Sequence, residues 1–435
     1  MKQNDFQFYI SGPIKLGIGF GVVSLLSRWV TGNTILSSPE TLVKYGLTGG
    51  VGYAFVGGLI LILFGYFAKI VRQKYPNHQT IGDILKEKLT VSGYWYMMIV
   101  LFFMGAYSLF IQAIGAGLLI DILFPIPVFF GMLLFLGLCL LIGGVGGIHR
   151  IHQLSVINVA LIFGAVITIP VYFYIQKGVY PVFEGIKLYH PYILFIKNTD
   201  AIWFIFTSVL VFLGQVITDR ATWQRIFIIQ KEKVRMSFTL TGLIWTTIPI
   251  ALTSLLMIVI SGRSYQNIYT LIFDLVNTIQ ATVFIILFVL FCFFAILSAS
   301  SSELHALNTL FIKNVLQVFR PLTDNEKWKY TLMISLVVCG FLIIVVSIIT
   351  PSHIQLLFFG GNLYAAIIFP LFYIILSKDI VPTLIPFSSL IGALCGYLFL
   401  PITNNLQTIW ISFLISGLIC LMVYISRFLY RKWMT

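Results

Sequence analysis

The sequence predicts an all-α integral membrane protein with about twelve transmembrane helices. Of its 435 residues, 59% are hydrophobic and only 9% are charged, whereas a soluble globular domain carries about 25% charged residues. Apolar stretches of roughly 18 residues or more recur along the chain, which is the pattern of membrane-spanning helices. A transmembrane barrel would instead show segments of about 10 residues with alternating polarity, and the sequence lacks that pattern.

The apolar stretches place the helices along the chain. The predicted spans are 12–37, 46–71, 94–122, 125–147, 152–176, 200–219, 237–261, 278–312, 330–350, 353–376, 380–401 and 407–427. We group them as five, five and two. Residues 1–377 then form a core of two five-helix repeats, at about 12–177 and 200–377, and residues 378–435 add two accessory helices and a short tail. Since five is odd, the second repeat is inserted upside down relative to the first.

The net charge of +13 indicates orientation and not a nucleic-acid partner. If the N-terminus lies inside, most basic residues fall on the inner side of the bilayer, as the positive-inside rule requires. The outer side receives Lys44, Lys177, Lys187, Lys197 and Arg263, and Arg28 alone lies at depth. The sequence therefore predicts a multi-pass protein of the cell membrane, embedded in the lipid bilayer, with both termini in the cytoplasm.

The residues that would indicate an enzyme are scattered. The six histidines are dispersed, the acidic residues lie almost wholly in loops or at span ends, and no catalytic motif is present. The five cysteines fall inside predicted spans without metal-ligand spacing, which is typical of small buried apolar residues. We expect no catalytic residues and no cofactor other than an ion, and the sequence leaves the oligomeric state open.

Two predicted helices are interrupted by polar residues. "SLLSRWVTGNTILSSPE" (Ser24–Glu40) places Arg28 in an apolar run and then breaks around Thr31–Pro39, and "FLGQVITDR" (Phe212–Arg220) ends the sixth span. These are the first helices of the two predicted repeats. Transporters place such interrupted segments at corresponding positions and bind substrate between them. The polar residues Thr31, Asn33 and Gln215 are therefore candidate substrate contacts.

The eighth span carries a polar stripe. In "FFAILSASSSELHALNTLFIKN" (Phe293–Asn314), small and polar residues recur at steps of three and four on an otherwise apolar helix. They are Ala295, Ser298, Ser302, His305 and Thr309, with Ser301 beside them. Such a stripe permits close helix packing, and its hydroxyl oxygens are also suitable ligands for a hard cation. Both interpretations stay open, and we expect His305 to be a hydrogen-bonding residue.

Three segments carry a resemblance to a known family. They are "TGNTILSSPETLVKYGLTG" (Thr31–Gly49), "TDRATWQRIFIIQKEKVRMS" (Thr218–Ser237) and "ILSASSSELHALNTLFIKNVL" (Ile296–Leu316). In this order and spacing, over about residues 12–377, the chain resembles the sodium:solute symporter family, of the leucine-transporter fold and the APC superfamily. The resemblance implies a secondary active transporter that moves a small organic solute across the cytoplasmic membrane by alternating access, coupled to sodium or to protons.

The resemblance also implies where sodium would bind. One sodium would be held by the carbonyls of Ser27 and Val30, the carbonyl of Ala295 and the hydroxyl of Ser298, but the second hydroxyl expected next to Ser298 is replaced by Ala299. The resemblance therefore implies a divergent member of the family with altered sodium sites.

A second sodium site, present in some members, uses an aspartate on the fifth helix. At that position this sequence has Ser155, whereas its would-be partners Ser301 and Ser302 remain. By the same alignment, Thr34 and Tyr53 match substrate-contacting positions, although Tyr53 could equally be a packed aromatic residue.

Three interpretations of Arg28 compete, because a charge in the membrane is costly and is usually paired or functional. It could bind an anionic group of the substrate, replace a sodium ion as a fixed positive charge, or be structural and paired with Glu303 or with freed carbonyls. Asp219 and Arg220 could pair with each other as a cytoplasmic gate or form a solvated interface pair. The alternatives to transport are a sensor of the same fold and a cell-envelope flippase or polymerase for lipid-linked sugars.

Overall fold

The computed structural model describes residues 6–12, 15–124, 126–262, 282–348 and 353–434. Within these residues, ten helices are long and apolar enough to cross a membrane. Two shorter apolar helices, α2 (Ile18–Trp29) and α17 (Leu384–Leu398), accompany them. The predicted all-α membrane fold is confirmed, and each of the twelve predicted spans contains a helix. Residues 13–14 of the span 12–37, the first residue of 125–147, the start of 278–312 and the end of 330–350 lie outside the described residues.

The other helices follow in chain order. They are α1 (Phe6–Ser11), α3 (Gly32–Lys74), α4 (Ile81–Lys88), α5 (Val91–Leu123), α6 (Val128–Cys139), α7 (Gly147–Lys177), α8 (Val179–Tyr189), α9 (Thr199–Thr218), α10 (Arg220–Ile228), α11 (Val234–Ile260), α13 (Thr282–Phe311), α14 (Gln317–Phe319), α15 (Asp324–Ile348), α16 (His353–Leu376) and α18 (Asn405–Met434). Two π-helical segments, Leu140–Val145 and Ile312–Leu316, extend α6 and α13, and Pro191–Leu194 is a short 3-10 helix.

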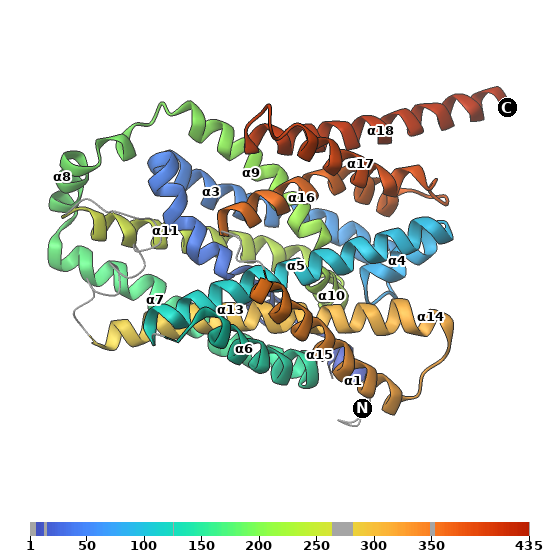
Figure 1. Ribbon diagram of the computed structural model, residues 1–435, viewed down its shortest axis with the longest axis horizontal. Coiled ribbons are helices and arrows are strands. Elements are labelled where there is room, and N and C mark those ends of the chain that lie inside the picture. Colours follow the sequence, from blue (N-terminus) through green and yellow to red (C-terminus); the bar gives the residue numbers. More distant parts are fainter. Residues whose placement is uncertain (1–5, 13–14, 125, 263–281, 349–352, 435) are drawn as a thin grey trace.

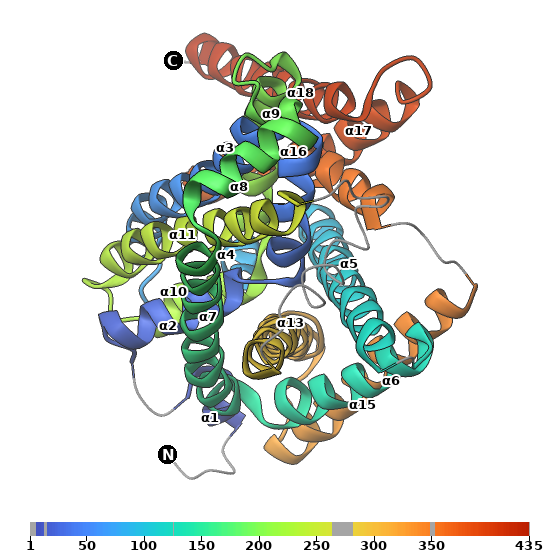
Figure 2. The same ribbon diagram turned by 90° about the vertical axis from the view of Figure 1, so that its left-hand side faces the viewer.

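The long helices run in one general direction, and α13 lies at their centre. α8 lies at one end of the bundle, whereas α4, α14 and both chain termini lie toward the other (Figure 1). Seen along the bundle, α13 is viewed nearly end-on, with α5, α6, α7 and α15 around it (Figure 2). The side chains of α13 are buried from Ala295 to Leu310. The polar stripe predicted for the eighth span therefore faces the protein interior.

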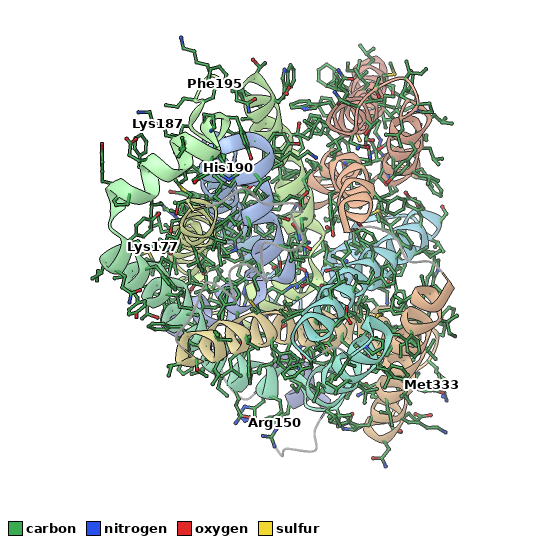
Figure 3. All side chains as sticks on the ribbon, turned by 60° about the vertical axis from the view of Figure 1, so that its left-hand side comes forward. Arg150, Lys177, Lys187, His190, Phe195 and Met333 are labelled. Carbon is green, nitrogen blue, oxygen red and sulfur yellow. The ribbon has the colours of Figure 1, made fainter. Side chains whose placement is uncertain are left out.

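The outer surface of the bundle is apolar. Phe20 on α2 is 63% exposed and Met333 on α15 is 50% exposed, and Met333 points away from the bundle (Figure 3). Lys177 and Lys187 project at the α8 end in the same view. An apolar belt with charged residues toward the ends is the surface expected of a multi-pass membrane protein.

The first predicted span breaks over two residues only. α2 ends at Trp29, Val30 and Thr31 are extended, and α3 begins at Gly32. The prediction of a break through Pro39 was too long. Ser38 stays helical because its hydroxyl donates to the Thr34 carbonyl (2.5 Å), which is how serine is accommodated in membrane helices.

Gly46 separates the first and second predicted spans without a loop. Its backbone angles, φ 70° and ψ −170°, lie in a region that only glycine adopts readily. α3 therefore bends at Gly46 and continues to Lys74.

The sixth predicted span breaks at Asp219, as the sequence indicates. α9 ends at Thr218, Asp219 is extended, and α10 begins at Arg220. The Asp219 carboxylate accepts from the backbone N–H of Thr222 (2.8 Å), which is a regular N-cap. The first helices of both predicted repeats are thus broken.

The half-helices α2 and α10 are joined side by side. Leu16 N–H donates to the Ile228 carbonyl (3.1 Å), and Gln230 N–H donates to the Leu16 carbonyl (3.0 Å). Farther along, Trp29 Nε1 donates to Thr222 Oγ1 (3.1 Å). α2 and α10 are therefore held together near both of their ends.

The N-terminal helix α1 packs against the bundle through Tyr9, which is 2% exposed. The Tyr9 hydroxyl donates to the Gly143 carbonyl (3.0 Å), and Nε2 of His305 donates to the Tyr9 carbonyl (2.9 Å). His305 is thus a buried hydrogen-bonding residue on α13.

The connecting helix α4 is tied to the end of α13 by Asp83. Its carboxylate accepts from Lys313 Nζ (2.7 Å), Asn314 Nδ2 (2.9 Å) and Gln79 N–H (2.9 Å). Burial raises the pKa of the Asp83 carboxyl, but the Lys313 ammonium and these hydrogen bonds outweigh burial, so its pKa lies below the ordinary 3.8.

The Asp83→Asn variant should therefore be less stable in a pH-dependent way. A carboxylate with a lowered native pKa stabilises the fold above its unfolded pKa and loses that contribution as the pH falls through the native value. We expect a loss of about 1 kcal/mol at pH 7 for this partly exposed pair, shrinking toward pH 3. Thermal unfolding in detergent at both pH values measures it, with Asp121→Asn as an exposed control. A difference that is constant with pH would contradict the assignment.

Candidate functional site

The two helix breaks face each other and are joined by a buried ion pair. Arg28, near the end of α2, donates from Nε to both carboxylate oxygens of Asp219 (3.2 and 3.1 Å) and from Nη2 to Oδ1. The two residues are 5% and 3% exposed. This is the two-point geometry in which arginine and carboxylate interact most strongly.

A second carboxylate extends this pair into a chain of four charges. Glu303 of α13 is fully buried and accepts from Nη2 of Arg28. Its other oxygen accepts from Nε (2.8 Å) and Nη2 (2.5 Å) of Arg220. Asp219 and Arg220, neighbours that could have paired with each other, instead bind partners from α2 and α13. We call Arg28, Asp219, Glu303 and Arg220 the charge cluster.

Further polar contacts satisfy the freed backbone at the first break. Thr34 N–H donates to Thr31 Oγ1 (3.4 Å), and Gly32 N–H donates to Oε1 of Gln112 on α5 (2.8 Å). The Trp29 carbonyl accepts from Thr34 Oγ1 (3.2 Å) and from Trp245 Nε1 of α11 (2.8 Å). Irregular backbone at membrane depth requires partners of this kind.

The residues predicted for the first sodium site lie together. The hydroxyls of Ser27 and Ser298 hydrogen-bond (2.5 Å), and Asn158 Nδ2 of α7 donates to Ser27 Oγ (3.0 Å). Val30 follows Ser27 by three residues and Ala295 precedes Ser298 by three, and both are fully buried. Next to Ser298, the Ala299 carbonyl accepts from Arg28 Nη1 (3.3 Å). Binding of sodium by these residues stays a prediction.

The residues predicted for the second sodium site have other partners. Ser155 donates its hydroxyl back to the Ile151 carbonyl (2.8 Å). Ser302 Oγ accepts from Nη2 of Arg225 (3.0 Å), and Ser301 Oγ is buried without a partner among the described residues. A guanidinium thus contacts one of the predicted ligands.

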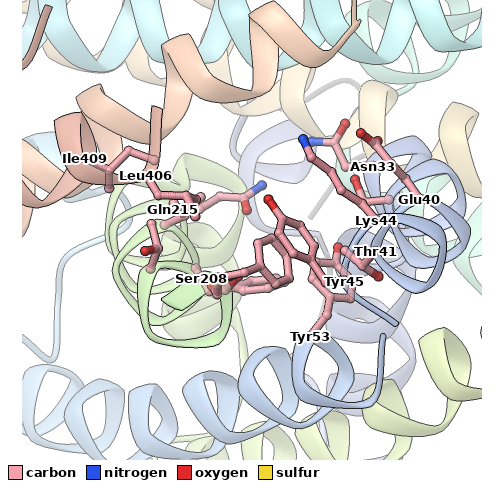
Figure 4. Close-up of a pocket in the computed structure, with 15 residues that line it drawn as sticks. Asn33, Glu40, Thr41, Lys44, Tyr45, Tyr53, Ser208, Gln215, Leu406 and Ile409 are labelled. Atoms are coloured by element: carbon pink, nitrogen blue, oxygen red, sulfur yellow. Dashed lines mark hydrogen bonds between the residues drawn. The ribbon is translucent and has the colours of Figure 1, made fainter. Parts of the chain in front are cut away.

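A pocket of about 140 Å³ lies between the first half of α3 and α9, with the start of α18 beside them. Three predicted substrate contacts, Asn33, Tyr53 and Gln215, line it; Arg28, Thr31 and Thr34 are not among its lining residues. Asn33 and Gln215 approach it from opposite sides (Figure 4). The other lining residues are Ser37, Glu40, Thr41, Lys44, Tyr45, Phe204, Thr207, Ser208, Val211, Phe212, Leu406 and Ile409.

Aromatic rings form much of this pocket. Tyr45 stacks on Phe204 with ring centroids 4.3 Å apart, and Tyr53 contacts Phe212 at 5.2 Å. Leu406 and Ile409 come from α18, so one of the helices expected to be accessory contributes to the wall.

Sequence reasoning missed several residues of these sites. Asn158 was visible only as one amide in a polar segment of the fifth span, and Gln112 gave no signal within its apolar helix. Arg225 was counted among the basic residues outside the membrane, but it is fully buried, because α10 packs against α13 and α2 inside the bundle after the break at Asp219.

A bundle whose first and sixth spans both break beside a pocket has the leucine-transporter fold, and comparisons with solved structures agree. A Na⁺-coupled sialic acid symporter matches with a TM-score of 0.76 and 15% identity, over 96% of this chain and 92% of that one. Mhp1, a nucleobase-cation-symport-1 family transporter, matches at 0.58 with 10% identity, over 98% and 96%. MhsT in complex with L-phenylalanine matches at 0.55 with 13% identity, over 95% and 100%.

The amino-acid sequence is similar to one curated relative in particular, a probable urea active transporter of Schizosaccharomyces pombe. The two are 21% identical over 364 residues, which cover 74% of this chain and 53% of the relative. The chain therefore spans about half the length of the curated relative that it matches. No family model matches the chain. The resemblance to sodium:solute symporters is confirmed at the level of the fold.

Proposed function

We propose that this protein is a secondary active transporter of a small organic solute, working by alternating access. The observation that carries the proposal is the pocket between the broken first and sixth spans, with Asn33 on one side and Gln215 on the other. The fold shared with Na⁺-coupled symporters supports it. The basic residues favour the end of the bundle that carries the termini, so both termini lie in the cytoplasm. The pocket then faces the outside. The membrane in this proposal is the cell membrane.

The solute is small, uncharged and able to form hydrogen bonds. A cavity of about 150 Å³ holds a molecule the size of benzene, and this pocket has about 140 Å³. Its lining carries amides, hydroxyls and the opposite charges of Glu40 and Lys44, which offset each other and leave no net charge for an ion to bind. Asn33 Oδ1 is buried without a partner among the described residues. That oxygen is suited to accept from an N–H or O–H of the solute, while the aromatic rings cover its apolar faces.

Arg28 has a structural role in this proposal and does not bind the solute. Four of the hydrogen bonds from its guanidinium go to Asp219 and Glu303, and a fifth goes to the Ala299 carbonyl. Asp219 and Arg220 contribute to gating through the charge cluster, which links the broken helices to α13. Breaking such a cluster is costly, so it favours the state in which α2 and α10 pack against α13.

Sodium coupling is centred on Ser27 and Ser298. Asn158 Oδ1 is buried without a partner among the described residues, and a turn of its amide would offer this oxygen in place of the hydroxyl missing at Ala299. With the Val30 and Ala295 carbonyls, these atoms form an oxygen set of the kind that hard cations need.

Uptake by proteoliposomes tests the function. We expect accumulation of a small neutral solute, found by a thermal-shift screen, that depends on a sodium or a proton gradient. Failure of any solute to accumulate under either gradient would refute transport and leave the sensor of the same fold as the alternative.

The Asn33→Ala variant should bind the solute about 2- to 13-fold more weakly, since a neutral hydrogen bond contributes about 0.5–1.5 kcal/mol. Titration of purified protein with the identified solute measures the dissociation constant. Gln176→Ala, which removes an exposed amide on α7, is the matched control. Equal affinities of the wild type and Asn33→Ala would exclude Asn33 from the site.

A further inference from the structure

Arg225 is a buried cation whose hydrogen bonds to described residues all go to neutral oxygen atoms. It lies on α10 with 0% exposure. Its Nε donates to the carbonyl and the hydroxyl of Ser24 (both 3.0 Å), Nη1 donates to the Ala221 carbonyl (2.9 Å), and Nη2 donates to Ser302 Oγ (3.0 Å). Within the described part of the chain, no carboxylate accepts from it, because Asp219 and Glu303 are engaged by Arg28 and Arg220.

These four oxygens are the kind of ligand set that a hard cation selects. Carbonyl and hydroxyl oxygens replace water around Na⁺ or Ca²⁺, whereas a buried guanidinium usually binds a carboxylate. The four oxygens come from α2, α10 and α13, so the guanidinium joins these helices as a bound ion would.

We propose that Arg225 is a built-in cation, which takes the place of a metal ion between α2, α10 and α13. The wild-type protein therefore has no vacancy for Na⁺ at Ser24, Ala221 and Ser302. Removing the side chain creates a monovalent-cation site there that Na⁺ or free guanidinium can occupy. This assignment rests on the proposed function and deepens it, because it specifies that the cation position at Ser24, Ala221 and Ser302 is permanently filled. Its test needs no transported solute.

The test is the thermal unfolding of the full-length Arg225→Ala variant in detergent. Unfolding is followed in NaCl, choline chloride and millimolar guanidinium chloride, at constant ionic strength. We expect the variant to be less stable than the wild type in choline. We expect Na⁺ or guanidinium to stabilise it saturably, with an elevenfold rise in the folded-to-unfolded ratio at ten times the dissociation constant. The wild type should lack this added response.

Two further variants make the test specific. Arg235→Ala removes an arginine that donates to the exposed Tyr66 hydroxyl (2.7 Å) and lies over the Tyr66 ring, away from the Arg225 site, and it should behave as the wild type does. Adding Ser302→Ala to Arg225→Ala removes one ligand and should weaken the response at least several-fold. Sodium bound at Ser27 and Ser298 would stabilise the wild type and all these variants alike. Subtracting the shift of the wild type from that of each variant therefore removes this contribution.

The outcomes separate the inference from the transport proposal. If Arg225→Ala gains no response to either cation beyond that of Arg235→Ala, the inference is overturned, whether or not the wild type transports a solute. If Arg225→Ala cannot be purified in choline, purification in NaCl or guanidinium supports the inference, and equal failure in all three media overturns it. A gained response without solute transport would refute only the transport proposal.

Discussion

An Arg28→Met variant should lose about 3–5 kcal/mol of its free energy of unfolding, the usual cost of breaking a buried ion pair. The substitution roughly keeps the side-chain length but leaves the Asp219 carboxylate, 3% exposed, without its guanidinium partner. Among the described residues, Asp219 would keep the N–H and hydroxyl of Thr222 as its donors (2.8 and 2.5 Å). Equilibrium unfolding in mixed detergent and denaturant measures the change, and Arg150→Met, on an exposed position, is the control.

The double variant Arg28→Met/Asp219→Leu should recover most of this loss. Replacing both partners of a buried pair by apolar residues is often neutral, because both desolvation costs disappear. Glu303 keeps Arg220 as its partner, and the remaining deficit is the lost N-cap of α10, about 1 kcal/mol. If the single and the double variant were equally unstable, the loss would come from packing and not from the unpaired carboxylate.

A Gly46→Ala variant should lose about 1–3 kcal/mol from backbone strain alone. At φ 70° and ψ −170°, an alanine is disfavoured, and its Cβ would lie 2.9 Å from the Ile193 carbonyl oxygen. That neighbour is backbone, so it cannot move aside as a flexible side chain can. The same unfolding assay measures the loss, and a second effect is expected on solute affinity, since Tyr45 of the pocket precedes the bend.

Gly137→Ala is the matched control for this variant. Gly137 lies inside α6, and a Cβ there meets nothing within 4 Å. Alanine should therefore stabilise the helix by about 0.5–1 kcal/mol. If Gly46→Ala were as stable as Gly137→Ala, the bend in α3 would not be a strained feature of the native state.

The fold could be predicted from the sequence because bilayer thickness sets the length of each apolar stretch. The two broken spans were also visible, since Arg28 and Asp219 are polar residues where a membrane helix should be apolar. The extent of the first break could not be predicted. Ser38 looks like a helix breaker in the sequence, but its hydroxyl donates to a carbonyl of the same helix, so the helix continues.

The candidate site was only partly predictable. The contact of Ser27 with Ser298 was expected, because both residues match sodium-ligand positions of the sodium:solute symporter family. Glu303, in contrast, was one of several partners considered for Arg28. Arg225 lies beyond the end of an apolar stretch, and counting charges therefore assigned it to the aqueous side. Its burial depends on the path of α10 after Asp219, which is a tertiary property that local composition does not encode.

The pairing of α2 with α10 has a mechanical consequence. The backbone bridge between Leu16 and Ile229 closes one end of the pair, and the Arg28–Asp219 contact closes the other. Because both ends are linked, α2 and α10 should move together as one rigid unit. The extended residues at the two breaks, Val30 with Thr31 and Asp219, are where such a unit would bend relative to α3 and α9. Opening this end of the bundle then requires the pair to move against α13 and α4, on which it packs, without α2 and α10 separating from each other.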